Sequence, residues 1–308
     1  MIPKDDALST RPSSKARARA KPQHAIEAAL PPHARAARTR LGELLLAPGP
    51  LPLVEATLLV AAEEYPELDV MAPMARVEAI GTEAARRVAG VTNPFARLDA
   101  VRALLFEDIG FRGNVEQYDD PRNSYLNEVL DRKLGIPLTL SILAIEVSRR
   151  AGLEAVGVGL PGHFIVRIVE QGRNLLIDPF HGGQIVTVED CRDLVVRTTG
   201  RASLFRKESL DAAAPRAMLT RLLLNLKRIH LAAGEYGKAL SVVERLLLVA
   251  PGDAKEIRDR GLLLAHLGQP AAAALDLECY LEMAPAAPDI ESVRGRLAWI
   301  LKKIDAGH

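Results

Sequence analysis

Aromatic residues and cysteine are both scarce in this chain. Phe, Trp and Tyr make up only 4% of the 308 residues, so a hydrophobic core has to be built mainly from Leu, Val and Ala. Two cysteines, Cys191 and Cys279, are too few for a disulfide framework and favour a reducing compartment. Neither belongs to a Cys and His cluster with metal-ligand spacing, so the sequence predicts no metal site and no cofactor.

A large net charge and a long apolar run are missing as well. The formal net charge of +1 gives no long-range field that would gather nucleic acid or acidic lipid. Nowhere do 18 apolar residues follow one another, and the N-terminus lacks the apolar core of a secretion signal. We therefore expect a cytoplasmic protein without a membrane span. Residues 1–24, rich in Arg, Lys, Ser and Pro, are expected to form a disordered basic tail rather than a nucleic-acid-binding arm.

Helical periodicity dominates the chain from residue 25 to about residue 110. Apolar residues three and four positions apart predict an amphipathic helix over residues 51–65, ended by Pro66. Two more helices are expected, one closed by Gly90 and one that follows Pro94.

The pattern changes between residues 111 and 200. A short helix is predicted after Asn123 or Ser124, either of which can cap its first turn, and a longer helix is predicted to begin at Pro137. Three apolar, partly β-branched runs then follow, separated by Gly and Pro, and they predict an antiparallel meander. These runs are LEAVGVGL, HFIVRIVE and NLLIDPF.

The last hundred residues are helical and repeat themselves. Gly234 and Gly268, Ala239 and Ala273, and Pro251 and Pro285 form pairs separated by 34 residues, the period of the tetratricopeptide repeat. We expect two repeats, at about residues 220–253 and 254–287, with a final helix as a cap. Because about three repeats are needed for independent stability, the array is expected to rest on the preceding domain.

A candidate site lies on the predicted hairpin of the second and third strands. If that hairpin turns near Gln171 and Gly172, Asp178 lies directly or diagonally across from His163 on the same face of the sheet. A slip of one residue would place the two side chains on opposite faces. With the expected register, the carboxylate can orient the imidazole as in the base and acid of a catalytic triad.

The stretch from RGNVEQYDDPRNSYLNEVLDRKLGIPLTL to GHFIVRI, with LLIDPFHGG after it, resembles the transglutaminase-like superfamily and, within it, the SirB-type proteins. The resemblance implies an α+β fold: a helical N-terminal part, a papain-type core with a small antiparallel sheet, and an all-α tetratricopeptide array. The expected domain limits are residues 25–200 and 201–308. In this superfamily a cysteine at the start of a helix precedes a strand histidine and an Asp-Pro pair.

His163 and Asp178 match the histidine and the acid of that pattern, but the position of the cysteine is occupied by Pro137. Proline has no nucleophilic group, and it removes an amide donor that would help to bind an oxyanion. Two substitutes are weak candidates. Ser141 lies one turn further along the helix, and nothing in the sequence around Cys191 directs its thiol toward His163.

Two interpretations of the histidine and its acid remain open: a buried pair that stabilises the hairpin, or part of a ligand-binding pocket. Four further residues are candidates for binding, each with a structural alternative in capping, packing or a solvated loop: Asn123, Tyr125, Asn127 and His181. Zinc bound by His163 and His181 would lack a third ligand.

The sequence therefore favours a non-catalytic interaction or regulatory protein, whose repeat array binds a protein or peptide partner. The alternative is a hydrolase or acyl transferase acting on peptide or amide bonds, with Ser141, Cys191 or an activated water as the nucleophile. Binding of nucleic acid would depend on the basic tail alone.

Overall fold

The computed structural model describes residues 30–306, so the predicted basic tail lies outside the described residues. The N-terminal part is helical, as expected, and proline begins two of its helices. Asn93 caps one of these, accepting hydrogen bonds from the backbone amides of Phe95 and Ala96. The helices are α2 (Pro32–Leu46), α3 (Leu53–Ala62), α4 (Met71–Val88) and α5 (Pro94–Arg102), the last continued by a π-helical turn at Ala103–Asp108.

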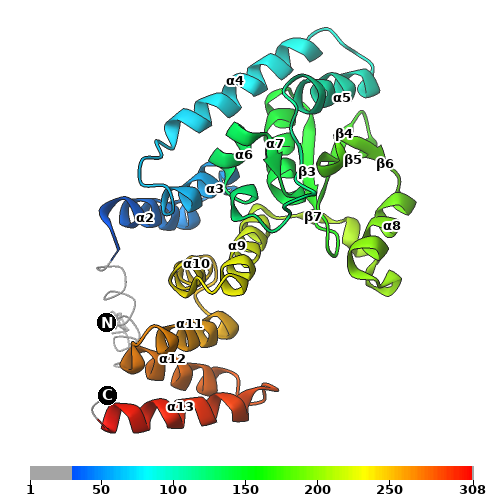
Figure 1. Ribbon diagram of the computed structural model, residues 1–308. Helices are drawn as coiled ribbons and strands as arrows, with labels where there is room; N and C mark the ends of the chain where they lie inside the picture. Colours follow the sequence, from blue (N-terminus) through cyan, green and yellow to red (C-terminus); the bar gives the residue numbers. More distant parts are fainter. Residues whose placement is uncertain (1–29, 307–308) are drawn as a thin grey trace, which may run out of the picture.

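A five-stranded antiparallel sheet forms the centre of the next part, in the order β6-β5-β4-β3-β7. Helix α7 (Pro137–Arg150) covers one face of this sheet (Figure 1). Its first residue is Pro137, whose missing amide costs nothing there because first-turn amides lack helical partners. The strands are β3 (Glu154–Val158), β4 (Ile165–Glu170), β5 (Arg173–Asp178), β6 (Gln184–Val186) and β7 (Ala212–Ala213).

The remaining elements of this part are short, apart from one helix. They are the parallel strand pair β1 (Arg112–Gly113) and β2 (Leu134–Gly135), the 3-10 turns η2 (Pro121–Asn123), η3 (Pro179–His181), η4 (Ala202–Leu204) and η5 (Lys207–Leu210), and helices α6 (Leu126–Arg132) and α8 (Val188–Thr199). Together with the sheet they give the α+β fold that the sequence predicts.

Two local predictions differ from the structure. Helix α6 begins at Leu126, and its first turn receives no side-chain hydrogen bond from the capping residue Tyr125, so neither Asn123 nor Ser124 is its cap. Asn123 ends the preceding turn η2, and its side chain bonds to the nearby loop. His163 lies in a turn two residues before β4 rather than in the strand itself.

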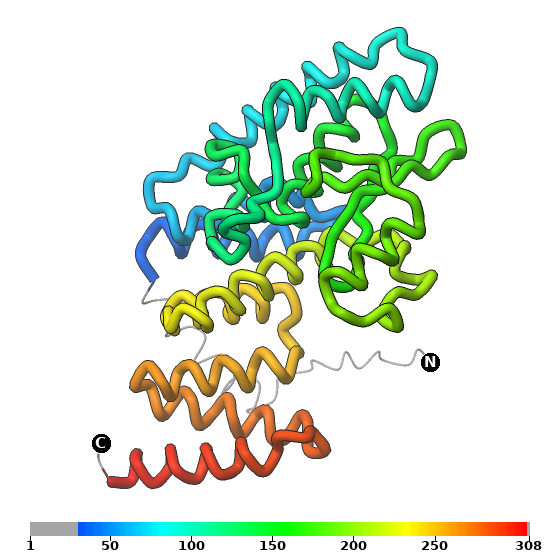
Figure 2. The backbone as a smooth tube through the Cα atoms, turned by 45° about the vertical axis from the view of Figure 1, so that its right-hand side comes forward, coloured from blue at the N-terminus to red at the C-terminus, as the bar shows by residue number. Residues whose placement is uncertain are grey.

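Five helices form the C-terminal array in the described part of the chain. In Figure 2 the first of them (yellow) lies against the preceding domain, and the later ones (orange to red) are stacked progressively farther from it. Gly234 and Gly268, at equivalent places in the two repeats, adopt φ values of 72° and 75° between paired helices. The helices are α9 (Pro215–Ala232), α10 (Tyr236–Val249), α11 (Ala254–His266), α12 (Pro270–Met283) and α13 (Ile290–Asp305). Gly261 lets helices α11 and α12 approach each other closely, since a Cβ at this position would lie 2.9 Å from a methyl carbon of Leu277.

The N-terminal helices and the array share one hydrophobic core. Leu41 of α2 and Leu59 of α3 pack in the same buried cluster as Leu223 of α9 and Val242 of α10. Arg38 adds a buried ion-pair network across this contact: it bonds to Glu63 at 2.7 Å and to Glu244 of α10. The array therefore rests on the preceding domain through buried contacts.

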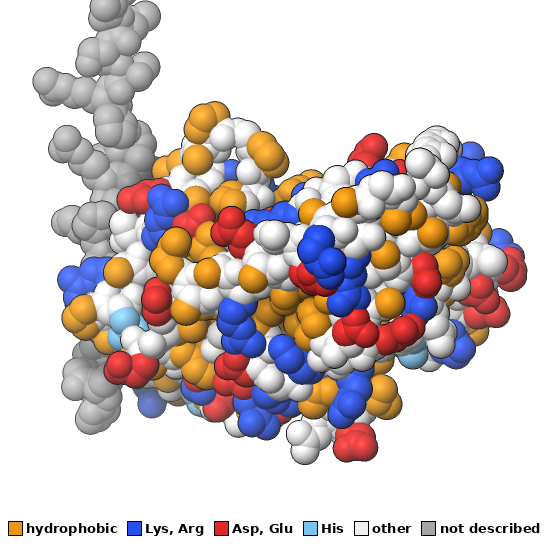
Figure 3. Space-filling model, turned by 90° about the horizontal axis from the view of Figure 1, so that it is seen from above, with side chains coloured by type: hydrophobic (Ala, Val, Ile, Leu, Met, Phe, Trp, Pro, Cys, Tyr) orange, Lys and Arg blue, Asp and Glu red, His pale blue; other side chains and the backbone are white. Residues whose placement is uncertain are grey.

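The surface carries charges of both signs. On the face drawn in Figure 3, acidic and basic side chains are interspersed with apolar ones, and no broad patch of one sign gathers there. Among the described helices, none combines the length and the apolar character needed to cross a bilayer.

Candidate functional site

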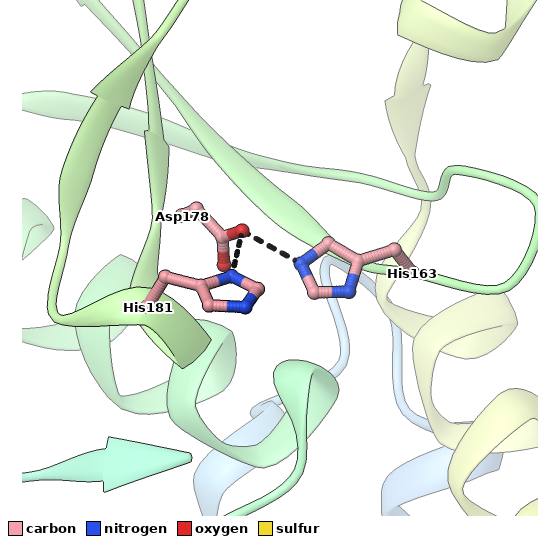
Figure 4. A group of neighbouring side chains, drawn as sticks. All are labelled: His163, Asp178 and His181. Carbon is pink, nitrogen blue, oxygen red and sulfur yellow. Dashed lines mark hydrogen bonds and ion pairs between the residues drawn. The ribbon is translucent and has the colours of Figure 1, made fainter. Parts of the chain in front are cut away.

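The register of the hairpin brings His163 and Asp178 together. Strands β4 and β5 pair Val166 with Ile177, which places Asp178 diagonally across from His163, one of the two predicted arrangements. His163 Nε2 lies 2.9 Å from Asp178 Oδ2, and both side chains are buried, with exposures of 4% and 2%. Figure 4 shows the imidazole approaching the carboxylate from the loop before β4.

His181 approaches the same carboxylate from another side (Figure 4). Its Nδ1 lies 2.7 Å from Asp178 Oδ2, while the backbone amide of Phe180 donates to Asp178 Oδ1 at 3.0 Å. Burial alone would raise the pKa of Asp178, but the hydrogen bonds and charges of the two imidazoles hold it below its usual 3.8. The carboxylate is therefore ionised at neutral pH and orients both rings.

A cleft of about 480 Å³ opens beside His163. Pro137 lines this cleft together with His163, so the predicted position of the nucleophile and the base face the same space. The other lining residues come from the loop before η2, the start of α7, the two neighbours of His163 in the chain and helix α9. They are Tyr118, Asp119, Ile136, Leu138, Gly162, Phe164, Arg221, Leu224, Asn225 and Arg228.

Neither substitute nucleophile reaches this cleft. Ser141 is fully buried inside α7, and its hydroxyl has no hydrogen-bond partner among the described residues. Cys191 is buried in α8, in a small apolar cluster that includes Leu160 and Ile165. Burial, reinforced by the charges of Asp190 and Asp178, raises the pKa of the Cys191 thiol to about 11, so the thiol stays protonated at neutral pH.

The three candidates before α7 lie outside the cleft lining. Asn123 is fully buried, and its amide donates to the carbonyl of Gln117 at 2.7 Å, which holds the loop that carries Tyr118. Tyr125 is buried in the core shared with the array, where its hydroxyl lies 3.3 Å from His230 Nε2. Asn127 is partly buried, and its side-chain oxygen has no hydrogen-bond partner among the described residues.

Helix α9 supplies lining residues that the sequence analysis did not single out. Arg221, Asn225 and Arg228 are four and three residues apart, so helical spacing places them on one face, although nothing local shows what that face meets. Arg221 donates to the carbonyls of His163 at 2.7 Å and Leu160 at 3.1 Å. Burial lowers the pKa of Arg221, which has no carboxylate partner among the described residues.

Comparison with known proteins agrees with the overall fold. The family model of the transglutaminase-like superfamily matches residues 72–224, and a tetratricopeptide-repeat model matches residues 226–298. A UPF0162 protein of Xylella fastidiosa (strain 9a5c) is 35% identical over 250 residues, which cover 80% of this chain and 89% of the relative. The chain belongs to the family of UPF0162 and SirB1 proteins.

Other members of the UPF0162 and SirB1 family match over most of their length. Protein SirB1 of Salmonella typhimurium is 32% identical over 212 residues, 67% of this chain and 77% of the relative. The UPF0162 protein YchA of Escherichia coli K12 is 29% identical over 258 residues, 82% of this chain and 94% of the relative. No solved structure matches the chain. The predicted SirB-type resemblance is confirmed.

Proposed function

We propose that this protein is a non-catalytic interaction module, in which the cleft beside His163 binds a peptide segment of a partner and the repeat array holds the same partner. One observation carries the proposal: Pro137 lines the cleft with His163, while Ser141 and Cys191 are buried elsewhere. A base and its acid without a side-chain nucleophile cannot form a covalent intermediate with a bound ligand.

Apart from Asp119, whose carboxylate is paired with Arg228, the cleft offers no other group suited to covalent catalysis among the described residues. Its lining includes no cysteine, serine or threonine, and the only lining hydroxyl is the phenol of Tyr118. Burial raises the pKa of Tyr118 above its usual 10.0, so this phenol stays neutral and is a poor nucleophile. His163 Nδ1 makes no hydrogen bond within residues 30–306, and we expect it to bond to the ligand.

The charge of the lining favours a peptide that presents a carboxylate. Arg221 lies at the cleft with its guanidinium held by backbone carbonyls and stacked over the Phe164 ring, 5.3 Å from its centroid. A desolvated cation that lacks a carboxylate partner gains most from an anionic ligand, and arginine binds carboxylates in a bidentate geometry. An acidic side chain or a C-terminal carboxylate of the partner meets this requirement.

Site-specific photo-cross-linking tests the proposal. A benzoylphenylalanine in place of Leu224, which lines the cleft and is 44% exposed, is expected to cross-link a partner protein in cells. The same substitution at Phe95, 44% exposed on α5 and outside both the cleft and the repeat array, is the control. We expect the cross-link only at position 224, and its loss when Arg221→Gln is added. Equal cross-linking at both positions would contradict a binding cleft.

The second candidate is a hydrolase of peptide or amide bonds that uses an activated water. The intact hydrogen bond between His163 and Asp178 at the cleft is the observation that favours it. Hydrolysis of a peptide library by the purified protein, lost in His163→Ala, would support this activity. Labelling of one residue by a thiol- or hydroxyl-reactive probe, also lost in His163→Ala, would instead indicate covalent catalysis.

A regulatory or scaffolding role in the cytoplasm fits this proposal. The net charge of +1 and the mixed charges of the surface in Figure 3 offer nucleic acid little electrostatic attraction. The expected activity of the cleft is to bind a peptide without a cofactor.

A further inference from the structure

His163, Asp178 and His181 place three potential metal-ligand atoms side by side. The imidazole nitrogens and the carboxylate oxygen all lie within 4.8 Å of one another. Both nitrogens face one oxygen, Asp178 Oδ2, at 2.9 Å and 2.7 Å (Figure 4). From this geometry we propose that the three side chains bind a divalent transition-metal ion such as Zn²⁺, at a site that shares His163 with the cleft but does not depend on the proposed peptide binding.

The spacing of the donor atoms is close to that of a coordination sphere. Ligand bonds of roughly 2.0–2.2 Å to zinc place neighbouring donor atoms about 3–3.5 Å apart. The two nitrogen-to-oxygen distances are shorter than this by a few tenths of an ångström, and the two nitrogens lie within 4.8 Å of each other, so rotation of the two rings would bring the three donors around one ion. On binding, each neutral ring would turn its lone pair toward the ion and carry its proton on the other nitrogen.

The surrounding contacts hold the donors in place before any ion arrives. The amide of Phe180 fixes Asp178 Oδ1, which leaves Oδ2 directed at the rings. The Phe180 ring meets both imidazoles edge-on, at centroid distances of 6.0 Å for His163 and 5.2 Å for His181. Arg221 anchors the backbone carbonyl of His163. An ion at this site would therefore order few new groups.

Ligand chemistry and access determine the class of ion. Two imidazoles and one carboxylate suit Zn²⁺ and other first-row transition metals, whereas Ca²⁺ and Mg²⁺ prefer sets of oxygen ligands. The His181 side chain is 45% exposed, so an ion can reach the site from solvent. Three protein ligands leave coordination positions for water or for a donor atom of a bound ligand. The sequence suggested only His163 and His181 as zinc ligands; the third ligand in the structure is Asp178.

Isothermal titration calorimetry of the full-length protein, without an affinity tag, with Zn²⁺ as the titrant tests the site. The wild type is expected to bind one equivalent that His181→Ala weakens by about 100-fold or more, because loss of a direct ligand costs at least as much as loss of an outer-shell partner. His266→Ala is the matched control: His266 is also exposed, but it lies on α11 against Tyr236, and its loss should leave the affinity unchanged.

A second variant and a second measurement guard against loss of folding. His163→Gln should also abolish the tight equivalent while the circular dichroism spectrum stays that of the wild type. Co²⁺ in place of Zn²⁺ should give visible d–d absorption in the wild type and in His266→Ala, but not in His181→Ala. Wild-type protein that binds no Zn²⁺, or variants His181→Ala and His163→Gln that bind it as tightly as the wild type, would overturn the proposal.

Discussion

Arg38 is the residue whose replacement tests how the repeat array is attached to the N-terminal helices. Its side chain is 4% exposed and bonds to two buried carboxylates, Glu63 at 2.7 Å and Glu244. Glu63 keeps a second cation, Arg245, at 3.6 Å, but Glu244 loses the partner to which it is bonded. Removing one member of a buried ion pair typically costs about 3–5 kcal/mol, and we expect Arg38→Met to cost about 3 kcal/mol of unfolding free energy.

The lower end of that range follows from the protonation of Glu244. Burial raises the pKa of Glu244 even in the presence of Arg38, so without Arg38 this carboxyl can take up a proton instead of remaining a buried charge. The cost of Arg38→Met should therefore shrink as the pH falls, because acid neutralises the unpaired carboxyl.

Urea unfolding followed by circular dichroism at 222 nm measures the effect. The matched control is Arg40→Met, two residues further along the same helix, where the arginine is 49% exposed and pairs with Glu43 and Glu55 at the surface. Exposed pairs contribute little, so this variant should unfold close to the wild-type midpoint. The reasoning is refuted if Arg38→Met stays within about 1 kcal/mol of the wild type, or if Arg40→Met is destabilised as strongly.

Two further predictions concern the site. Pro137→Cys should place a thiol in the cleft of His163, and iodoacetamide should alkylate this thiol rapidly below pH 8. In the double variant Pro137→Cys with His163→Ala, the alkylation should be slow again. A rate that follows an ordinary thiol pKa of about 8.5 in both proteins would contradict the shared cleft. Asp178, whose pKa lies below 3.8 in the folded protein, contributes stability that is present above about pH 4 and lost as the pH falls through its folded pKa. The stability difference between the wild type and Asp178→Asn, from urea unfolding at pH 7, 4 and 3, should therefore narrow on acidification, and a constant difference would argue against the ionised carboxylate.

Local chemistry was enough to predict much of the fold. Proline at the first position of α7, glycine between paired helices and the 34-residue period all act over a few residues or repeat regularly, so they are visible in the chain. The hairpin turn at Gln171 and Gly172, with φ values of 49° and 75°, limited Asp178 to two possible places relative to His163. The cap of α6 failed as a prediction because Asn123 bonds to a loop rather than to the helix.

The composition of the site was much harder to predict. Arg221 lies 58 residues from His163 in the chain, and only the packing of α9 against the transglutaminase-like domain brings them together. His181 follows Asp178 by three residues, yet whether its ring turns toward the carboxylate or toward solvent depends on the turn η3. The burial of Cys191 depends on how α8 packs, which its own sequence does not encode.

The amino-acid sequence by itself determined the order of the elements, the repeat period and the strand register to within one alternative, because each depends on neighbouring residues. Only the tertiary structure decided that Pro137, His163 and Arg221 line one cleft and that His181 joins the buried pair. These contacts join side chains from distant segments, and their positions follow from the packing of whole helices against the sheet rather than from any local preference.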